Sequence, residues 1–194
     1  KEARMISQQL QFGKKVIDPK LGSRAAMHTH PFFEVGLDQP VSENQGDVLM
    51  GTLGWTGNFR FTFEVDNAGN LRVIPAINPY ASNYELKKDE VFTAPEFIFT
   101  LSNQGSSQGS RNLHEWARNY SLKDGKGPRL TLLNNWENTG FDFNQEILAN
   151  LMKEAKHLGV DMFLLDDGWF GNKYPRKDDH AGLGDWEVTH SKLP

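Results

Sequence analysis

The sequence has 194 residues, a formal net charge of −4 and no cysteine. The absence of cysteine excludes a disulfide scaffold, a cysteine-ligated zinc site and a thiol nucleophile. A mildly acidic chain without basic clusters argues against nucleic acid or an anionic membrane as a partner. No apolar run approaches the ~20 residues of a membrane span, so we expect a soluble protein, and the choice between cytoplasm and periplasm stays open.

The first hundred residues predict β structure. Phe59, Phe61 and Phe63 alternate with polar residues, which places the rings on one face of a sheet. Residues 66–70 are rich in Asp, Asn and Gly and favour a turn, so residues 59–77 are predicted to form a hairpin. A second alternation follows at residues 97–101. Short strands separated by turn signals are typical of an antiparallel β-sandwich.

The pattern changes after residue 101. Residues 102–110 are small and polar, which indicates a loop. Leu113, Trp116 and Tyr120 then recur with helical spacing, with Ser110 as a candidate N-cap. Trp116 is interpreted as core packing on this helix. We predict a linker helix within residues 105–127, ended by glycines and a proline near residue 128.

The remaining residues have the pattern of an α/β protein. Residues 129–135 and 160–165 are short apolar runs typical of buried parallel strands. Between them, residues 144–158 carry an apolar stripe with Asn144 as N-cap and Gly159 after the last turn. This order predicts a βαβ unit with parallel strands and a right-handed crossover.

Polar and aromatic residues follow both predicted strands. The first strand ends in Asn-Asn-Trp-Glu at residues 134–137, and the second in Asp-Asp-Gly-Trp-Phe-Gly at residues 166–171. Parallel sheets bind ligands at the carboxyl ends of their strands. Carboxylates accept hydrogen bonds from sugar hydroxyls and a ring covers the apolar face of a pyranose, so a sugar site is favoured.

Other interpretations of these residues stay open. Asp-Gly is a common turn pair, and an ordinary turn at residues 166–168 is one alternative. A hard cation held by the acidic residues is a second, although their spacing fits no calcium loop (Asp166, Asp167, Asp178, Asp179, His180). Zinc at His28 and His30 is a third, weakened by the lack of a third ligand. We expect no metal site and no cofactor.

At these residues the sequence resembles the α-galactosidases of glycoside hydrolase family 36. The segments LLNNWE at 132–137, FLLDDGWFG at 163–171, GDWEV at 184–188 and KLP at 192–194 resemble blocks at the start of the family's catalytic barrel. Upstream, HPFF at 30–33, ENQGD at 43–47 and GNF at 57–59 resemble its N-terminal β-sandwich. The resemblance covers nearly the whole chain.

The resemblance implies both an architecture and a set of site residues. Residues 1–104 would be the C-terminal part of the N-terminal β-sandwich and residues 128–194 the first βα units of a (β/α)8 barrel. Asp166 and Asp167 match the acidic pair that binds the 4- and 6-hydroxyls of a galactosyl unit in the family. Trp136 and Trp186 match aromatic positions that line this pocket. Asp185 also lies in a matching block and is a further candidate, although it could instead hold its loop through backbone hydrogen bonds.

The family's two catalytic carboxylates have no match in this sequence. The resemblance places the nucleophile in a Lys-x-Asp context at the fourth barrel strand and the acid/base near the sixth, beyond Pro194. Since eight βα units take ~250 residues, residues 128–194 amount to roughly two. The sequence is therefore interpreted as a fragment that is inactive alone.

The function implied is retaining hydrolysis of terminal α-galactosides such as those of the raffinose series, without a cofactor. The resemblance to bacterial members of the family implies a homotetramer for the intact enzyme. An α-N-acetylgalactosaminidase or an α-galactosyl transferase of the same architecture is the alternative. A noncatalytic carbohydrate-binding protein and a metal-dependent phosphotransferase using Asp166 and Asp167 are alternatives of other classes.

Overall fold

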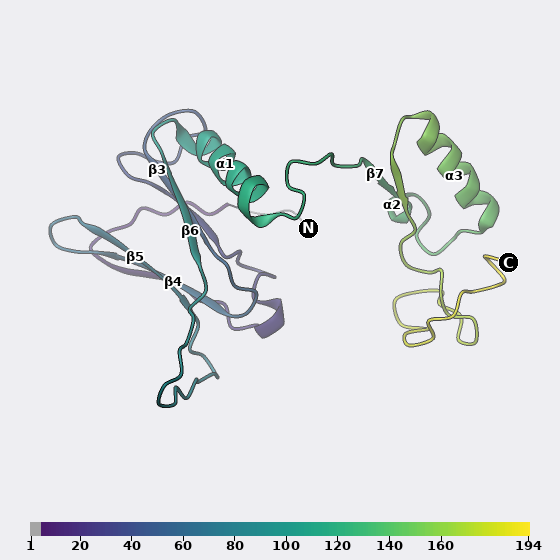
Figure 1. The fold of residues 1–194 in the computed structure, drawn as a ribbon, viewed down its shortest axis with the longest axis horizontal. Helices are drawn as coiled ribbons and strands as arrows, with labels where there is room; N and C mark the ends of the chain where they lie inside the picture. The colour runs from purple at the N-terminus through teal and green to yellow at the C-terminus, as the bar shows by residue number, and fades with distance from the viewer. Residues whose placement is uncertain (1–4) are drawn as a thin grey trace. The chain divides into compact units, whose positions relative to one another are not determined.

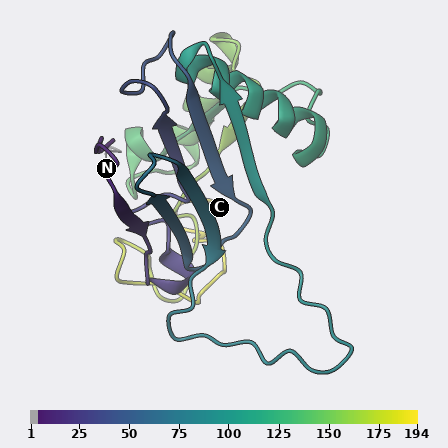
Figure 2. The same ribbon diagram turned by 90° about the vertical axis from the view of Figure 1, so that its left-hand side faces the viewer.

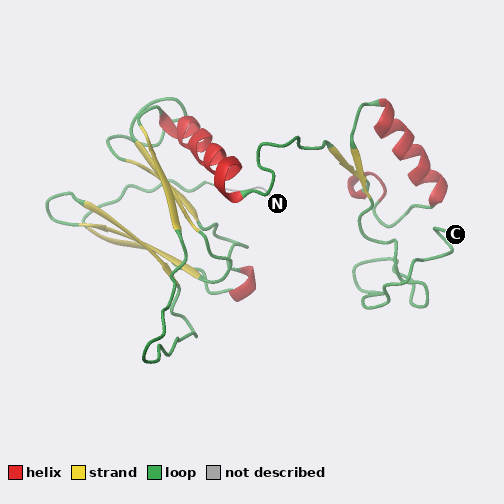
Figure 3. Cartoon of the chain, viewed as in Figure 1, coloured by secondary structure: helices red, strands yellow, loops and turns green. Residues whose placement is uncertain are grey.

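The computed structural model describes residues 5–194, which form two compact units that divide between Lys126 and Gly127 (Figure 1). The first unit is mostly sheet, and the second contains two short strands and two helices (Figure 3). Within residues 5–194, no helix is long and apolar enough to cross a membrane.

The first unit contains two three-stranded antiparallel sheets. One sheet has the order β1-β4-β5, formed by Gly13–Ile17, Phe59–Val65 and Leu71–Ile77. The other has the order β2-β3-β6, formed by Phe32–Gly36, Val48–Leu53 and Phe97–Ser102. A short 3-10 helix, Gly22–Arg24, follows β1. The segment between β5 and β6, residues 78–96, has no regular secondary structure and loops away from both sheets (Figure 2).

The predicted hairpin is confirmed. Strands β4 and β5 pair in register from Phe59 with Ile77 to Val65 with Leu71. Asp66 stabilises the turn, because its carboxylate accepts hydrogen bonds from the amides of Ala68 and Asn70 at 2.9 Å each. The alternating rings of β4 form the core together with residues of the facing sheet and its surroundings (Ala25, Phe33, Leu53, Phe59, Phe61, Phe63).

The sequence interpretation of residues 102–110 as a loop with Ser110 as N-cap was wrong. Helix α1, Gly105–Trp116, begins five residues before Ser110 and packs against β6 and β3. Small residues allow this close packing, since a Cβ on Gly109 would lie only 2.1 Å from Sδ of Met50 in β3. Amides of the first turn donate to the backbone carbonyls of Ser42 and Glu43, which replaces the side-chain cap.

After α1 the chain forms one π-helical turn, Ala117–Ser121, and then enters the second unit. There β7, Leu132–Asn134, and β8, Met162–Leu164, pair in parallel, as predicted. The predicted helix between them is confirmed as α3, Gln145–His157. Its N-cap is Asn144, whose side chain accepts from the amide of Ile147 at 3.0 Å. The sequence did not indicate α2, Trp136–Thr139, a single turn that directly follows β7.

Candidate sugar-binding site

The parallel register of β7 and β8 brings the two predicted strand ends together. Asn134 pairs with Leu164, so the residues that follow each strand emerge side by side. The Asn134 side chain donates from Nδ2 to Oδ2 of Asp166 at 2.6 Å. Its Oδ1 accepts from the amide of Trp136 at 2.8 Å, which directs the chain into α2.

Asn135 connects the same two strand ends from the interior. Its side chain is fully buried, with 0% exposure. Oδ1 accepts from the backbone amide of Asp166 at 2.8 Å, and Nδ2 donates to Oγ1 of Thr139 at 2.8 Å. The backbone of Asp166 is thus attached to α2 through one buried amide side chain.

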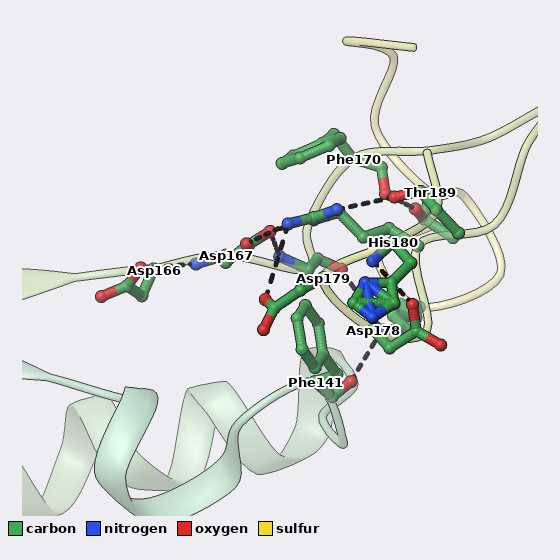
Figure 4. A network of polar contacts seen from close by, with 12 residues as sticks. Phe141, Asp166, Asp167, Phe170, Asp178, Asp179, His180 and Thr189 are labelled. Atoms are coloured by element: carbon green, nitrogen blue, oxygen red, sulfur yellow. Dashed lines mark hydrogen bonds and ion pairs between the residues drawn. The ribbon is translucent and has the colours of Figure 1, made fainter. Parts of the chain in front are cut away.

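Asp166 and Asp167 have different surroundings, although they are adjacent in the sequence. Oδ1 of Asp166 accepts from the backbone amide of Asp167 at 2.8 Å, while its Oδ2 receives Asn134. Asp167 instead binds a guanidinium group, accepting at Oδ1 from Nε of Arg176 at 2.5 Å and at Oδ2 from Nη2 at 2.6 Å. Figure 4 shows the two carboxylates directed away from one another.

The Arg176 hydrogen bonds keep Asp167 ionised. They lower the pKa of the Asp167 carboxyl below its ordinary value, and the amide of Gly168, which donates at 2.6 Å, adds to this effect. The Asp167 side chain keeps 26% of its surface exposed. A fixed, charged and partly accessible acceptor is suited to a sugar hydroxyl.

Aromatic rings border both strand ends. Trp136 packs edge-to-face on Phe141, with ring centroids 4.8 Å apart. Trp186 lies 4.7 Å from the ring of Phe170 and is 64% exposed. Trp136 thus lies just after β7, and Trp186 lies on Phe170 in the loop after β8 with its ring largely exposed, as a ring that covers the apolar face of a sugar would be.

Asp185 stabilises the loop that follows β8. Its Oδ2 accepts from the backbone amides of Lys173 and Tyr174 at 2.8 and 2.9 Å, and its carbonyl accepts from the amide of Gly171. These contacts fit the alternative role of Asp185, in which it holds its loop through hydrogen bonds to the backbone.

Lys192 links the two strand ends from the C-terminal side. Its Nζ donates to the carbonyls of Phe141 at 2.8 Å and of Gly168 at 3.2 Å, and lies 4.8 Å from the ring centroid of Phe143. Burial lowers the pKa of this ammonium group. The lysine lies in the KLP block at residues 192–194, but no spacing in the sequence indicated these partners.

Residues 5–194 contain no group of three or more His, Asp or Glu side chains arranged to hold a metal ion. The acidic residues considered for a cation are bound to other groups: Asp167 binds Arg176, and Asp178 accepts from the amide of His180 at 2.8 Å. His28 and His30 lie in the connection between the 3-10 helix and β2, outside the strands.

Two further residues of this site were missed by sequence reasoning. Arg176 stands in a charged segment that resembles a solvated loop, and Asn135 is one of two consecutive asparagines of which only the second is fully buried. A buried arginine needs a partner, but the sequence alone does not reveal which charged residues are buried.

Comparison with known proteins identifies the family. The model of the glycosyl hydrolase family 36 N-terminal domain matches residues 1–87, and the Melibiase model matches residues 91–194. Alpha-galactosidase 2 of Hypocrea jecorina is 33% identical over 196 residues, covering 100% of this chain and 26% of that protein. The chain thus spans about a quarter of the length of the curated relatives it matches.

Solved structures agree with these matches. The crystal structure of the GH36 alpha-galactosidase AgaA from Geobacillus stearothermophilus superimposes with a TM-score of 0.82 at 36% identity, covering 95% of this chain and 25% of that one. A variant of AgaA in complex with raffinose gives a TM-score of 0.81 at 35% identity, with the same coverage of 95% and 25%.

Proposed function

The chain belongs to glycosyl hydrolase family 36, of which it holds N-terminal domain sequence and the start of the catalytic domain, and we propose that it is part of an α-galactosidase. The whole protein hydrolyses terminal α-galactosyl residues of oligosaccharides such as those of the raffinose series. The AgaA complex with raffinose, found at 35% identity, supports this substrate class.

The observation that carries the proposal is the pair of carboxylates at one edge of the sheet. Asp166 and Asp167 follow β8, each is held by neighbouring side chains, and Asp167 is kept ionised. In the proposed role they accept hydrogen bonds from the 4- and 6-hydroxyls of a galactosyl unit, while Trp136 and Trp186 cover its apolar face. A charged acceptor fixed beside the axial 4-hydroxyl discriminates against glucose, which would leave the carboxylate without its partner. Asp185 contributes by holding the adjacent loop.

The proposed architecture follows the family. Residues 1–104 are the C-terminal part of its N-terminal β-sandwich, residues 105–127 are the connecting helical segment, and residues 128–194 are the N-terminal part of its (β/α)8 barrel. Hydrolysis proceeds by double displacement, with retention at the anomeric carbon, through a carboxylate nucleophile and an acid/base carboxylic acid. Neither role is assigned to a residue of this chain, because Asp166 and Asp167 are binding groups.

Steady-state kinetics of the whole protein on p-nitrophenyl α-galactoside test this proposal. Asp166→Ala should raise KM at least about tenfold, since a hydrogen bond to a charged acceptor contributes about 1.5–3 kcal/mol. Glu154→Gln serves as the control, because this carboxylate lies at an exposed position of α3. EDTA should leave the activity intact. No turnover by the wild-type protein, or equal KM values for the two variants, would count against the proposal.

A further inference from the structure

Arg176 is a buried charged residue. Neither the sequence pattern nor the proposed mechanism assigns it a role. It lies in the loop after β8, and its side chain is only 5% exposed. Its guanidinium carbon lies 5.0 Å from the ring centroid of Phe170 and 5.5 Å from that of Phe141. The rings hold the planar group in place by packing and by cation–π attraction.

The surrounding loop is shaped to this side chain. A Cβ on Gly182, where φ is +73°, would lie 2.9 Å from Cβ of Arg176, and one on Gly171, where φ is +92°, would lie 2.9 Å from its amide nitrogen. Nη1 donates to the carbonyl of Ala181 at 2.6 Å. The arginine therefore has little freedom to change rotamer, and its remaining donors point in a fixed direction.

Nε and Nη2 hold the carboxylate of Asp167, and Nη2 also lies 3.9 Å from Oδ1 of the exposed Asp179. Nε and Nη2 bind one oxygen each, the two-pronged geometry that arginine provides and lysine does not. Oδ1 also receives the amide of Gly168 at 2.6 Å. A carboxylate offers about four acceptor positions, so three hydrogen bonds leave one position, on Oδ2, for a further donor.

We propose that Arg176 is a positioning residue that orients Asp167 so that its one remaining acceptor position, on Oδ2, meets a single hydroxyl of the bound galactosyl unit. This inference rests on the proposed function, since it takes Asp167 to be a sugar-binding group. Arg176 does not touch the sugar; it acts through the carboxylate. The specificity for one hydroxyl geometry thus depends on an arginine outside the contact surface.

A merely structural arginine would stabilise the loop without setting the binding geometry, and a double-mutant cycle separates the two roles. The whole protein is prepared as R176K, R176M, D167N and the double variant R176M/D167N, and KM and kcat are measured with p-nitrophenyl α-galactoside. R176M should raise KM about tenfold and change kcat less than about threefold, because lost uniform binding appears in KM. R176K keeps the charge but loses the two-pronged contact, so its KM should lie between that of the wild type and that of R176M.

The decisive value is the effect of R176M on the D167N background. If Arg176 acts only through Asp167, the second substitution should change KM by less than about twofold. Thr189→Val is the control for loop stability, because the buried Thr189 hydroxyl donates to the carbonyl of Phe170 at 2.7 Å without touching Asp167. It should lower the melting temperature and leave KM unchanged.

The outcomes distinguish the inference from the function on which it rests. Full additivity of R176M and D167N, or a KM increase in Thr189→Val equal to that of R176M, would overturn the positioning role while leaving the α-galactosidase intact. A wild-type protein without turnover on the galactoside would overturn the proposed function, and with it this role for Arg176.

Discussion

Asn135→Ala is expected to loosen the end of β8, after which Asp166 and Asp167 follow, because Asn135 holds the backbone amide of Asp166. The substitution removes two hydrogen bonds from a side chain with 0% exposure, one from the amide of Asp166 and one to Oγ1 of Thr139, both 2.8 Å long. The Thr139 hydroxyl retains the carbonyl of residue 135 at 3.3 Å as a partner. The backbone amide of Asp166 loses its hydrogen bond to Asn135. This loss therefore sets the free-energy cost of the substitution.

A donor left without a partner costs about 1–3 kcal/mol when it is buried; the Asp166 amide is partly buried, and we take ~2 kcal/mol for the loss of both Asn135 contacts at this strand end. The free energy of local opening should fall by that amount, which corresponds to roughly 30-fold faster amide exchange. Hydrogen exchange of the whole protein, followed in peptides covering residues 163–168, measures this directly. Asn138→Ala, at an exposed position of α2, is the matched control and should leave exchange unchanged.

The same variant has a kinetic consequence. A displaced Asp166 backbone misplaces the carboxylate that we assign to a sugar hydroxyl, so KM for the α-galactoside should rise about three- to tenfold. Unchanged exchange at residues 163–168 together with an unchanged KM would refute the reasoning, because it would mean that Asn135 does not hold the strand end.

Three further predictions concern pH, the first unit and the isolated chain. Arg176 lowers the pKa of Asp167 in the folded state, so its stabilisation is complete above the unfolded value of about 3.9 and disappears as the pH falls through the lower folded value. Melting temperatures between about pH 6 and pH 3 should therefore fall less steeply for Asp167→Asn than for the wild type; parallel curves would contradict this. Gly109→Ala forces a methyl group against the buried Met50. Overpacking that costs about 1–3 kcal/mol should outweigh a helix-propensity gain of about 1 kcal/mol, so denaturant unfolding should show a lower free energy of unfolding. A stabilised variant would disprove the tight contact. The isolated 194-residue chain should not hydrolyse p-nitrophenyl α-galactoside; turnover sensitive to Asp167→Ala would overturn the binding role.

Elements with a strong local signal could be predicted from the sequence. The β4–β5 hairpin follows from alternating rings around an Asp-Asn-Ala-Gly-Asn turn, and α3 follows from an apolar stripe bounded by Asn144 and Gly159. In both cases the residues that set the boundaries act within a few positions of one another. The parallel pairing of β7 and β8 followed from the same pattern, because parallel neighbours need a crossover connection of about a dozen residues or more, and this connection is usually a helix.

Helix α1 could not be predicted at its first turn, because its stability there comes from distant residues. Gly105 and Gly109 have low helix propensity, and the segment around them is typical of a loop. Their value lies in the approach to β3 and in the carbonyls of residues 42–46 that accept from the first amides. The local sequence pattern indicates neither of these contacts.

The residues of the candidate site likewise fall into those that the sequence indicated and those that it did not. Asp166, Asp167 and Trp136 could be selected because they follow strand ends, where ligands bind in parallel sheets, whereas Trp186 was selected only through the family resemblance. Arg176 follows Asp167 by nine positions in an irregular loop, so its bidentate contact depends on how that loop closes. Residues that position others are hidden from sequence patterns when their partners lie outside regular secondary structure.

We propose above all that this chain supplies the galactosyl-binding edge of a retaining α-galactosidase. Proton NMR of the whole protein acting on raffinose, recorded in the first minutes of the reaction, tests it most directly. The account predicts that galactose is released and that the α-anomer appears first, before mutarotation. Initial release of β-galactose, or no release of galactose at all, would contradict it.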